Sequence, residues 1–402
     1  MNGKVVGGLA ALIAAGLVTG CGSSSESGGG DKSPLKVVLI PPSGGALAQM
    51  GKDATSGWEY AAAEANANGG VAGHKVEIIK SSTDGTPAAT VRAARKAVTQ
   101  EQAKYISGVI TSPEQGALLQ QLPAMGALNL LGLGKDDTLT GSACSPNAFR
   151  AVHSTAMEIA AFTKVLSELP AKRWAIQAVD YSTGHTAAEN FKKAAEAAGK
   201  EVVFEQFIPL GTTDFGSSIT KLKSVDADGL FGLVPGADGV AFIKQGAQFK
   251  LFDQYKTVFG FQMVSEPLFD ALGDNIVGFY SNLGYDVTAA NAKNQAFVKG
   301  YSEKFGVAPY GVAADHYLAA QMLFEAVKQS GSVDPNEVKA TLNGLQFDSF
   351  AGPVTVGPDH QLVRPAYVGQ VVKQDDGKLA FDVVAEVPGA EAHPKPDPTC
   401  KA

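Results

Sequence analysis

The sequence has few cysteines and little charge of either sign. Its 402 residues include three Cys, and 33 Lys and Arg stand against 40 Asp and Glu, a formal net charge of −7. Three cysteines are too few for a disulfide scaffold or a cluster of metal ligands, and an acidic chain lacks the basic footprint of a nucleic-acid binder. Charged residues make up 18% and hydrophobic residues 45%. This globular composition excludes a disordered chain and a protein that spans a membrane many times.

Motifs of catalysis and cofactor binding are also absent. The sequence has no HExxH, GxSxG or CxxC, and its six histidines are scattered without ligand spacing. The run Gly132–Lys135 is not a phosphate-binding P-loop, because Asn129 stands where the first glycine is required and Asp136 where Ser or Thr is required. We therefore expect no metal, no cofactor and no enzymatic activity.

The first 20 residues have the pattern of a secretory signal peptide. Their apolar stretch is too short and too rich in glycine for a spanning helix, and the Val18-Thr-Gly-Cys21 that ends it resembles the bacterial lipobox. We predict a signal peptide over 1–20, lipidation of Cys21 and a flexible Gly/Ser-rich tether over 21–34. The protein would be extracytoplasmic and lipid-anchored, at the periplasmic face or the cell surface of a bacterium. The alternative is an ordinary secretory signal with an incidental cysteine.

The two other cysteines, Cys144 and Cys400, would then lie in an oxidising compartment. Two cysteines left over in such a compartment favour one disulfide, which would fix the C-terminal tail to the loop after Leu139. Spacing in the sequence does not establish that the two residues are close, so the bridge is an expectation.

After the tether, short β-rich runs alternate with helical segments. Strands are expected over Lys36–Ile40 and Tyr105–Ile110, and helices over Gly57–Asn68 and Val312–Ser330, among others. This alternation indicates βαβ units and parallel sheets. More than about ten such strands exceed one sheet, so we expect an α/β protein with two doubly wound lobes. Short β runs over 347–387 would return across this body.

In open α/β sheets, small ligands bind at the carboxyl ends of the strands, near helix N-termini. The segments expected there carry hydroxyls, glycines and one lysine: Ser43–Gly45, Thr111–Pro113, Gly132–Lys135, Asp180–Gly184, Pro235–Asp238 and Gln262–Met263. These residue types suit binding, and no activated nucleophile stands beside a base. The residues by themselves therefore favour a binding protein.

Together these landmarks resemble the branched-chain amino-acid branch of the type I periplasmic binding proteins, the receptor subunits of ABC importers. The resemblance covers about residues 35–387 and depends on the order and spacing of its stretches. These are Gly57–His74 with its Glu64–Gly73 turn, Ser107–Ser112, Phe149-Arg150, Asp180–Gly184, Asp214-Phe215, Tyr310–Ala320, Gly352–Thr355 and Arg364-Pro365.

The resemblance implies two Rossmann-like, doubly wound lobes that are joined by a three-crossover hinge and close on the ligand like a clamp. Each lobe would be built from segments that are not contiguous. The expected division is 35–151 and 285–366 for the N-terminal lobe, and 152–284 and 367–402 for the C-terminal lobe and tail.

The resemblance also implies a binding site between the lobes. Thr111 and Ser112 would bind the ligand's carboxylate at the start of a helix, although Ser112 would equally suit a plain helix cap before Pro113. The other ligand-binding positions expected are Gly134, Lys135, Tyr181, Thr183, Gln262 and Met50, together with Pro235 from the strand ends above.

Lys135, Gln262 and Met50 depart from the family's pattern. Lys135 stands where the family has small residues, and is either a surface lysine or an extra partner for a carboxylate. Gln262 stands where an acidic residue usually pairs with the ligand's ammonium. Its neutral amide disfavours a zwitterionic amino acid, because a charge-assisted pair is stronger than an amide contact. If the alignment is shifted, Glu266 would take the ammonium role. Met50 stands where an aromatic residue often lines the pocket.

The sequence therefore predicts the solute receptor of an ABC importer. It would deliver a small carboxylate-bearing solute, a branched-chain amino acid or a related organic or aromatic acid, to the permease. The alternatives are a ligand sensor or an enzyme on the same fold, and a receptor for an amide or urea-type solute. The expected partners are the solute, the permease subunits and, through the lipid anchor, the membrane. No nucleic acid is expected, and the chain is expected to be a monomer.

Overall fold

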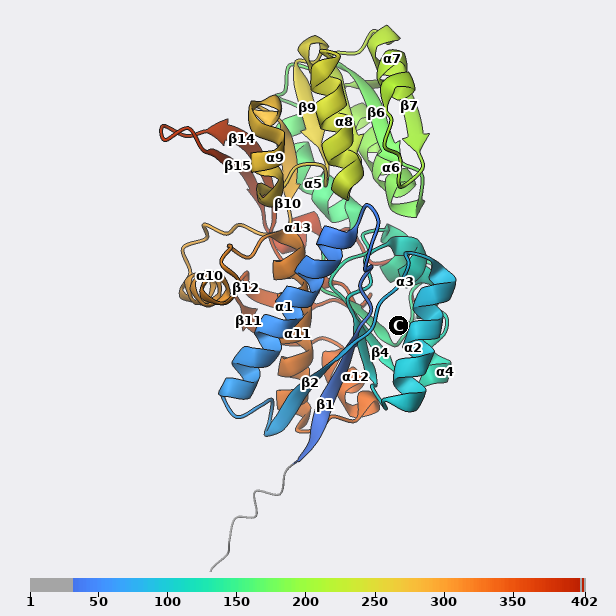
Figure 1. Cartoon of the computed structure of the whole chain (residues 1–402), viewed down its shortest axis with the longest axis vertical. Coiled ribbons are helices and arrows are strands. Elements are labelled where there is room, and N and C mark those ends of the chain that lie inside the picture. The colour runs from blue at the N-terminus through green and yellow to red at the C-terminus, as the bar shows by residue number, and fades with distance from the viewer. Residues whose placement is uncertain (1–31, 398–399, 401–402) are drawn as a thin grey trace, which may run out of the picture. The chain divides into compact units, whose positions relative to one another are not determined.

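The computed structural model describes residues 32–397 and Cys400, and Figure 1 shows its helices and strands. The predicted signal peptide, Cys21 and most of the predicted tether lie outside the described residues. Strand β1 begins at Lys32, within the range predicted as tether. No helix in this part of the chain is both long enough and apolar enough to cross a membrane.

The first sheet has five strands in the order β2-β1-β3-β4-β5, and the pairs β1–β3, β3–β4 and β4–β5 are parallel. Its elements are β1 (Lys32–Leu39), α1 (Ala48–Ala67), β2 (His74–Lys80), α2 (Pro87–Gln100), β3 (Tyr105–Ser107), α3 (Ser112–Leu119), α4 (Leu122–Met125), β4 (Leu128–Leu131), the 3₁₀ turn η1 (Asp137–Thr140) and β5 (Ala148–Arg150). Alternate residues of β1 face opposite sides. Val37 lies in one apolar cluster with Trp58 of α1, and Val38 in another with Ala94 of α2. Helices therefore cover both faces.

The second sheet has seven strands in the order β15-β14-β10-β9-β8-β6-β7. The neighbouring strands β10, β9, β8, β6 and β7 are parallel, whereas β14 is antiparallel to both of its neighbours, β10 and β15. The elements are α5 (Thr155–Leu166), β6 (Arg173–Val179), α6 (Ser182–Ala197), β7 (Glu201–Ile208), α7 (Gly216–Ser224), β8 (Gly229–Leu233), α8 (Gly236–Gln248), η2 (Phe252–Gln254), β9 (Thr257–Gly260), η3 (Glu266–Leu268), α9 (Phe269–Leu272), η4 (Gly273–Ile276), β10 (Tyr280–Leu283), β14 (Ala366–Lys373), β15 (Leu379–Val387) and α13 (Gly389–Ala392). Ile176 and Ala175 of β6 belong to separate apolar clusters, so this sheet too is covered on both faces.

The remaining elements belong to the lobe that contains the five-stranded sheet. They are α10 (Ala292–Phe305), α11 (Gly311–Ser330), α12 (Pro335–Leu342) and a small sheet of β11 (Gln346–Ser349), β12 (Gly352–Val356) and β13 (Leu362–Val363). Helix α11 lies alongside α1 (Figure 1). The chain thus passes between the lobes after β5, after β10 and after β13. The predicted fold class, two doubly wound lobes with three crossovers, is confirmed; the residues at which each lobe begins and ends stay a prediction.

Two elements differ from the sequence prediction for reasons of packing. Strand β3 ends at Ser107 and not at Ile110, because the next residue, Gly108, has a φ of +83°. Helix α1 begins at Ala48, nine residues before the predicted start, although its first turns contain residues of poor helix propensity. Gly51 is buried there, and a Cβ at this position would lie 2.4 Å from the Pro42 carbonyl oxygen. The close approach leaves no room for a side chain at Gly51, and the packing of α1 along α11 stabilises the helix against the local preference.

Cys144 and Cys400 form a disulfide with a Cα–Cα distance of 5.6 Å, so the predicted bridge is present. Between β15 and this bridge, α13 packs on α5, and the next residue, His393, places its Nε2 3.2 Å from Asp359 Oδ2. The C-terminal tail therefore runs from the seven-stranded sheet to the loop between η1 and β5.

Arg364 lies where the three crossovers meet. Its side chain is 1% exposed and forms an ion pair with Asp315 of α11, which is equally buried. Its Nε donates to the Ala151 carbonyl on the first crossover at 3.2 Å, and its Nη1 donates to the Gly284 carbonyl on the second. Because Arg364 is itself part of the third crossover, one guanidinium fastens all three.

We predict that Arg364→Met lowers the free energy of unfolding by about 3–5 kcal/mol, because it leaves Asp315 as a buried carboxylate without its partner. The matched control is Arg173→Met, which removes an exposed pair with Glu201 and should cost less than about 1 kcal/mol. Urea denaturation of both variants measures the difference. Equal, small losses would show that Arg364 does not hold the hinge.

Candidate functional site

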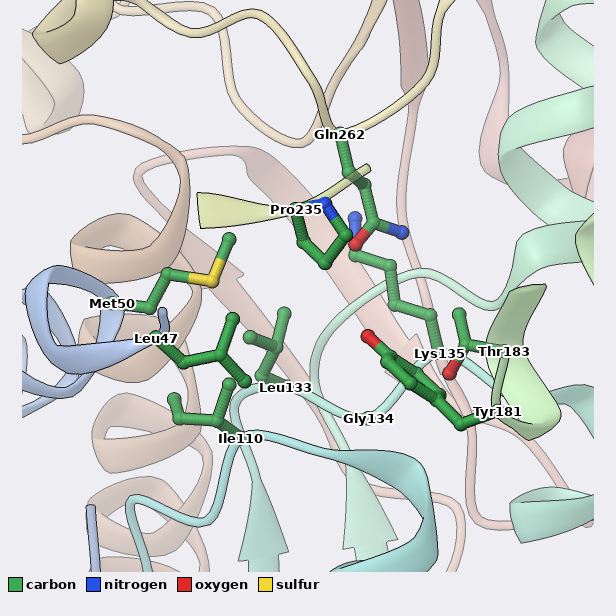
Figure 2. A pocket seen from close by; sticks show the side chains of 10 residues that line it. All are labelled: Leu47, Met50, Ile110, Leu133, Gly134, Lys135, Tyr181, Thr183, Pro235 and Gln262. Atoms are coloured by element: carbon green, nitrogen blue, oxygen red, sulfur yellow. The ribbon is translucent and has the colours of Figure 1, made fainter. Parts of the chain in front are cut away.

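A pocket lies between the two lobes, at the carboxyl ends of strands from both large sheets (Figure 2). Its lining residues come from the start of α1 and from the segments after β3, β4, β6, β8 and β9. They are Leu47, Met50, Ile110, Leu133, Gly134, Lys135, Tyr181, Thr183, Pro235 and Gln262. This is the position in which open α/β sheets bind small ligands.

The walls of the pocket are close together. The backbone N–H of Ala237, at the start of α8, donates to the Ala46 carbonyl beside α1 at 3.0 Å. The free volume inside is about 10 Å³, about the space of one water molecule. A solute therefore enters only when the lobes or the lining side chains move apart.

All of the predicted binding residues except Thr111 and Ser112 line this pocket. The sequence prediction missed Leu47, Ile110 and Leu133. Ile110 and Leu133 directly precede the predicted residues Thr111 and Gly134 in the sequence. Their position next to predicted binding residues could have indicated that they line the pocket. Leu47 had no such signal, because the start of α1 follows from the packing of Gly51.

Thr111 and Ser112 make contacts within the protein. Thr111 is the N-cap of α3, and its hydroxyl donates to Glu114 Oε2 at 2.7 Å. The capping role considered for Ser112 thus belongs to Thr111. Ser112 Oγ lies 2.7 Å from Thr183 Oγ1 and accepts from the backbone N–H of Asp136. Ser112 therefore reaches the pocket through Thr183, and direct ligand contact by Thr111 or Ser112 stays a prediction.

Glu114 changes the electrostatics at the start of α3. Its carboxylate is fully buried and accepts hydrogen bonds from the hydroxyls of Thr83, Thr90 and Thr111. A carboxylate in the first turn already complements the positive end of the helix dipole. This helix start is therefore less favourable for a ligand's carboxylate than the sequence alone indicated.

Lys135 is the one cationic side chain among the pocket's lining residues. Its Nζ lies 2.5 Å from Oε1 of Glu158 on α5, and the two side chains are 6% and 1% exposed. Lys135 is thus a buried residue of the site, which excludes the alternative of a surface lysine. The sequence prediction missed Glu158, although a single acidic residue in an otherwise apolar helical stretch was a signal of a buried partner.

Arg150 positions the segment that carries Lys135. Its buried guanidinium donates from Nη1 to the Asp136 carbonyl at 2.7 Å and from Nη2 to Thr140 Oγ1 at 2.6 Å. Its Nε donates to Gln361 Oε1 at 2.5 Å. The Lys135 segment is therefore fixed to β5 and, through Arg150, to Gln361, the residue before β13.

Gln262 faces Lys135 from the other lobe (Figure 2). Its φ is +53°, unusual for a residue with a side chain, and its backbone N–H donates to Asn282 Oδ1 at 2.8 Å. Its Nε2 is buried and has no hydrogen-bond partner. A buried amide donor without a partner is costly, so this group is available to an acceptor on a ligand.

The other lining groups complete a pocket with one polar and one apolar side. Leu47, Met50, Ile110 and Leu133 form the apolar side. Burial raises the pKa of Tyr181, so its phenol stays protonated and can donate to a ligand.

The lining residues include no carboxylate. Glu266, the alternative ammonium partner, is not among them, and burial raises its pKa to about 7. Over residues 32–397 and Cys400, no group of three or more His, Cys, Asp or Glu side chains is placed to hold a metal ion. The arrangement can therefore bind an acceptor group at one end and an apolar body at the other.

Comparisons with known proteins agree with this architecture. Residues 34–378 of this chain match the sequence profile of a family described as "Periplasmic binding protein". A Leu/Ile/Val-binding protein homologue of Brucella melitensis is 26% identical over 360 residues, 85% of this chain and 89% of that protein.

Two solved structures of ABC-transporter solute-binding proteins from Rhodopseudomonas palustris are also similar. One, in complex with 3,4-dihydroxybenzoic acid, has a TM-score of 0.82 and 26% identity, and the match covers 89% of this chain and 98% of that one. The other, in complex with 4-hydroxybenzoate, has a TM-score of 0.81 and 26% identity, over 89% and 97% of the two chains. With its profile match, its two lobes and its pocket between them, this chain belongs to the periplasmic binding protein family, whose members are extracytoplasmic solute-binding receptors.

Proposed function

We propose that this chain is the receptor of an ABC importer for a small carboxylic acid that lacks an α-ammonium group. One observation carries this proposal: the pocket offers hydrogen-bond donors but no carboxylate acceptor. Lys135 and Gln262 offer donors from opposite lobes, whereas no carboxylate lines the pocket to receive an ammonium. A charged ammonium buried without a partner is strongly disfavoured.

The donors suit a carboxylate in number and position. Of the three hydrogens on the Lys135 ammonium, one is directed to Glu158, and two are available to a second acceptor. Gln262 Nε2 adds a donor from the facing lobe, and Tyr181 also lines the pocket (Figure 2), whereas the Thr183 hydroxyl lies 2.7 Å from Ser112 Oγ. The apolar side of the pocket would then receive the ring or branched chain of the acid.

The relatives support this class of solute. The two similar Rhodopseudomonas structures hold hydroxylated benzoic acids, and the Brucella relative is named for leucine, isoleucine and valine. Both groups of compounds carry a carboxylate and an apolar body. They differ in the ammonium, for which the pocket of this chain offers no lining carboxylate.

A second candidate is a receptor for a neutral amide or urea-type solute. It is favoured by one observation: Lys135 is already neutralised by Glu158, so the polar side of the pocket has no net charge. A sensor or an enzyme on the same fold would use the same pocket for another purpose.

Delivery to a permease and anchoring by lipid complete the proposal. The small free volume of the pocket fits an entry of solute by parting of the lobes, for which the three crossovers would provide the hinge. Release would occur at a membrane permease. Lipid on Cys21 would keep the receptor near that permease through the tether.

A matched set of solutes tests the solute class. We expect benzoate and 4-methylpentanoate to bind and to raise the thermal transition, and we expect leucine and 4-methylpentanamide to bind at least tenfold more weakly. Isothermal titration calorimetry measures the four affinities. If leucine binds and its des-amino analogue does not, the site is centred on an ammonium. If the amide binds as tightly as the acid, the second candidate is correct.

Loss of the Lys135 ammonium should remove acid binding. The variant is Lys135→Met combined with Glu158→Gln, so that no unpaired charge remains buried, and we expect at least a 30-fold loss of affinity for benzoate. Lys164→Met on α5 removes only an exposed pair with Glu391 and should bind as the unmodified protein does. Unchanged affinity in the double variant would place the acid elsewhere.

Gln262→Glu should invert the preference for an ammonium. The new carboxylate removes a donor and repels an acid, which should weaken benzoate binding by about 1–3 kcal/mol, and it provides the missing partner for leucine. Gln295→Glu, an exposed position on α10, controls for the added charge. Titration of both variants with benzoate and leucine gives the result; a Gln262→Glu protein with unaltered preference would contradict the role of this residue.

The lipid anchor depends on a single thiol. Cys21→Ala should abolish incorporation of labelled fatty acid and release the protein from the membrane fraction, because the thiol is the acylation site. The pair Cys144→Ala and Cys400→Ala should keep the label. Fatty acid on the Cys21→Ala protein would rule out the anchor.

A further inference from the structure

The ion pair behind the pocket has an unused acceptor. Glu158 Oε1 binds Lys135 Nζ at 2.5 Å, whereas Glu158 Oε2 is buried and has no hydrogen bond of good geometry, although the Asn282 side chain lies near the carboxylate. Glu158 lies on α5 and Lys135 in the segment after β4, so the pair joins the two lobes at the wall of the pocket. The Lys135 ammonium is the group that an acid in the pocket would share with Glu158.

In the described part of the chain, no cation around this pair is left without a carboxylate. Asp315 of α11 is paired with Arg364, and the Arg150 guanidinium of β5 lies near Asp136, Asp137, Asp359 and Glu158. These carboxylates outnumber the cations, so a further negative charge at this end of the pocket finds no free cation to offset it.

His153, on the first crossover, is the remaining titratable neighbour. It is fully buried, and burial holds its pKa well below the usual value, so it is neutral. The pair of Lys135 and Glu158 has no net charge. A carboxylate that enters beside it adds one buried negative charge that nothing nearby offsets, and such a charge is costly.

We propose that Glu158 sets the charge of the pocket by taking up one proton from solvent when a carboxylic acid binds to Lys135, so that the receptor binds the acid and a proton together. This inference rests on the function proposed above. The proton goes to the Glu158 carboxylate, the ammonium of Lys135 turns to the acid, and the net charge of the buried group is unchanged. Glu158 thereby acts as a positioning residue for Lys135 and also favours singly charged acids over diacids.

The direction of the pH dependence follows from this exchange. Burial raises the pKa of Glu158 even though Lys135 lowers it, and an acid that draws the ammonium away raises this pKa further. Proton uptake then occurs at pH values between the pKa of the free protein and the higher pKa of the complex. Across that interval the affinity falls as pH rises, by up to tenfold per pH unit for one proton.

A purely structural Glu158 would behave differently. If it only held Lys135 in position, acid binding would release or take up no proton, and its removal would weaken binding equally at every pH. Proton uptake is therefore the readout that separates the two roles.

The test is calorimetry with benzoate and 4-methylpentanoate between pH 5.5 and 8.5, each in two buffers of different ionisation enthalpy. The unmodified protein should take up about one proton per acid, and its affinity should fall with rising pH. Glu158→Gln should take up none, and its affinity should be independent of pH and exceed that of the unmodified protein at pH 8.5. Glu391→Gln, which removes an exposed carboxylate next to the same helix, should match the unmodified protein.

Each other outcome has a definite meaning. Binding without proton uptake by the unmodified protein would overturn the inference and leave the proposed function intact. Uptake that persists in Glu158→Gln would assign the proton to another buried group, such as His153. No binding of either acid to either protein would overturn the proposed function and the inference with it. Uptake by the unmodified protein is measured without any variant, so a failure of Glu158→Gln to fold does not prevent the test.

Discussion

The arrangement of the two lobes depends on the buried guanidinium of Arg364. It hydrogen-bonds to a carbonyl group on each of the other two crossovers, and Asp315 balances its charge. The fit around it is close: α13 begins at Gly389, where a Cβ would lie 2.7 Å from the Arg364 backbone nitrogen. Because the pocket is lined from both lobes, this fixed hinge also decides which side chains can face one another. A movement that opens the pocket must occur around this point.

Buried carboxylates that already have partners lie behind the polar side of the pocket. Glu114 complements the start of α3, and Glu158 neutralises Lys135. Gln262, in contrast, is held by Asn282 in a left-handed backbone conformation and keeps a buried amide without a partner. Buried polar groups are rarely left unpaired in proteins, and Gln262 Nε2 is the unpaired buried group among the lining residues of this pocket. We therefore expect selectivity in this pocket to depend on the unpaired amide of Gln262 more than on the number of polar residues.

Much of this was predictable from the sequence, because it depends on local patterns. The alternation of strands and helices gave the fold class, and the strand ends located most of the lining residues, including Lys135 and Gln262. The position of Leu47 was not predictable in this way, and for Glu158 the sequence signalled burial but not the identity of its partner. Leu47 depends on the contact between Gly51 and Pro42. Glu158 depends on a partner 23 residues away in the other lobe. Burial and long-range pairing decide such positions, and neither has a periodic signature.

The disulfide has a mechanical consequence for the hinge. It fastens the end of a chain segment that leaves the seven-stranded sheet to the loop before β5, and so adds a fourth covalent path between the lobes. Seven residues, 393–399, separate α13 from Cys400 of the bridge, and a chain of that length spans at most about 30 Å. The length of this covalent path would set an upper limit to any movement that draws its two ends apart. Reduction of the bond would release this limit and widen the range of open states without altering a single residue of the pocket.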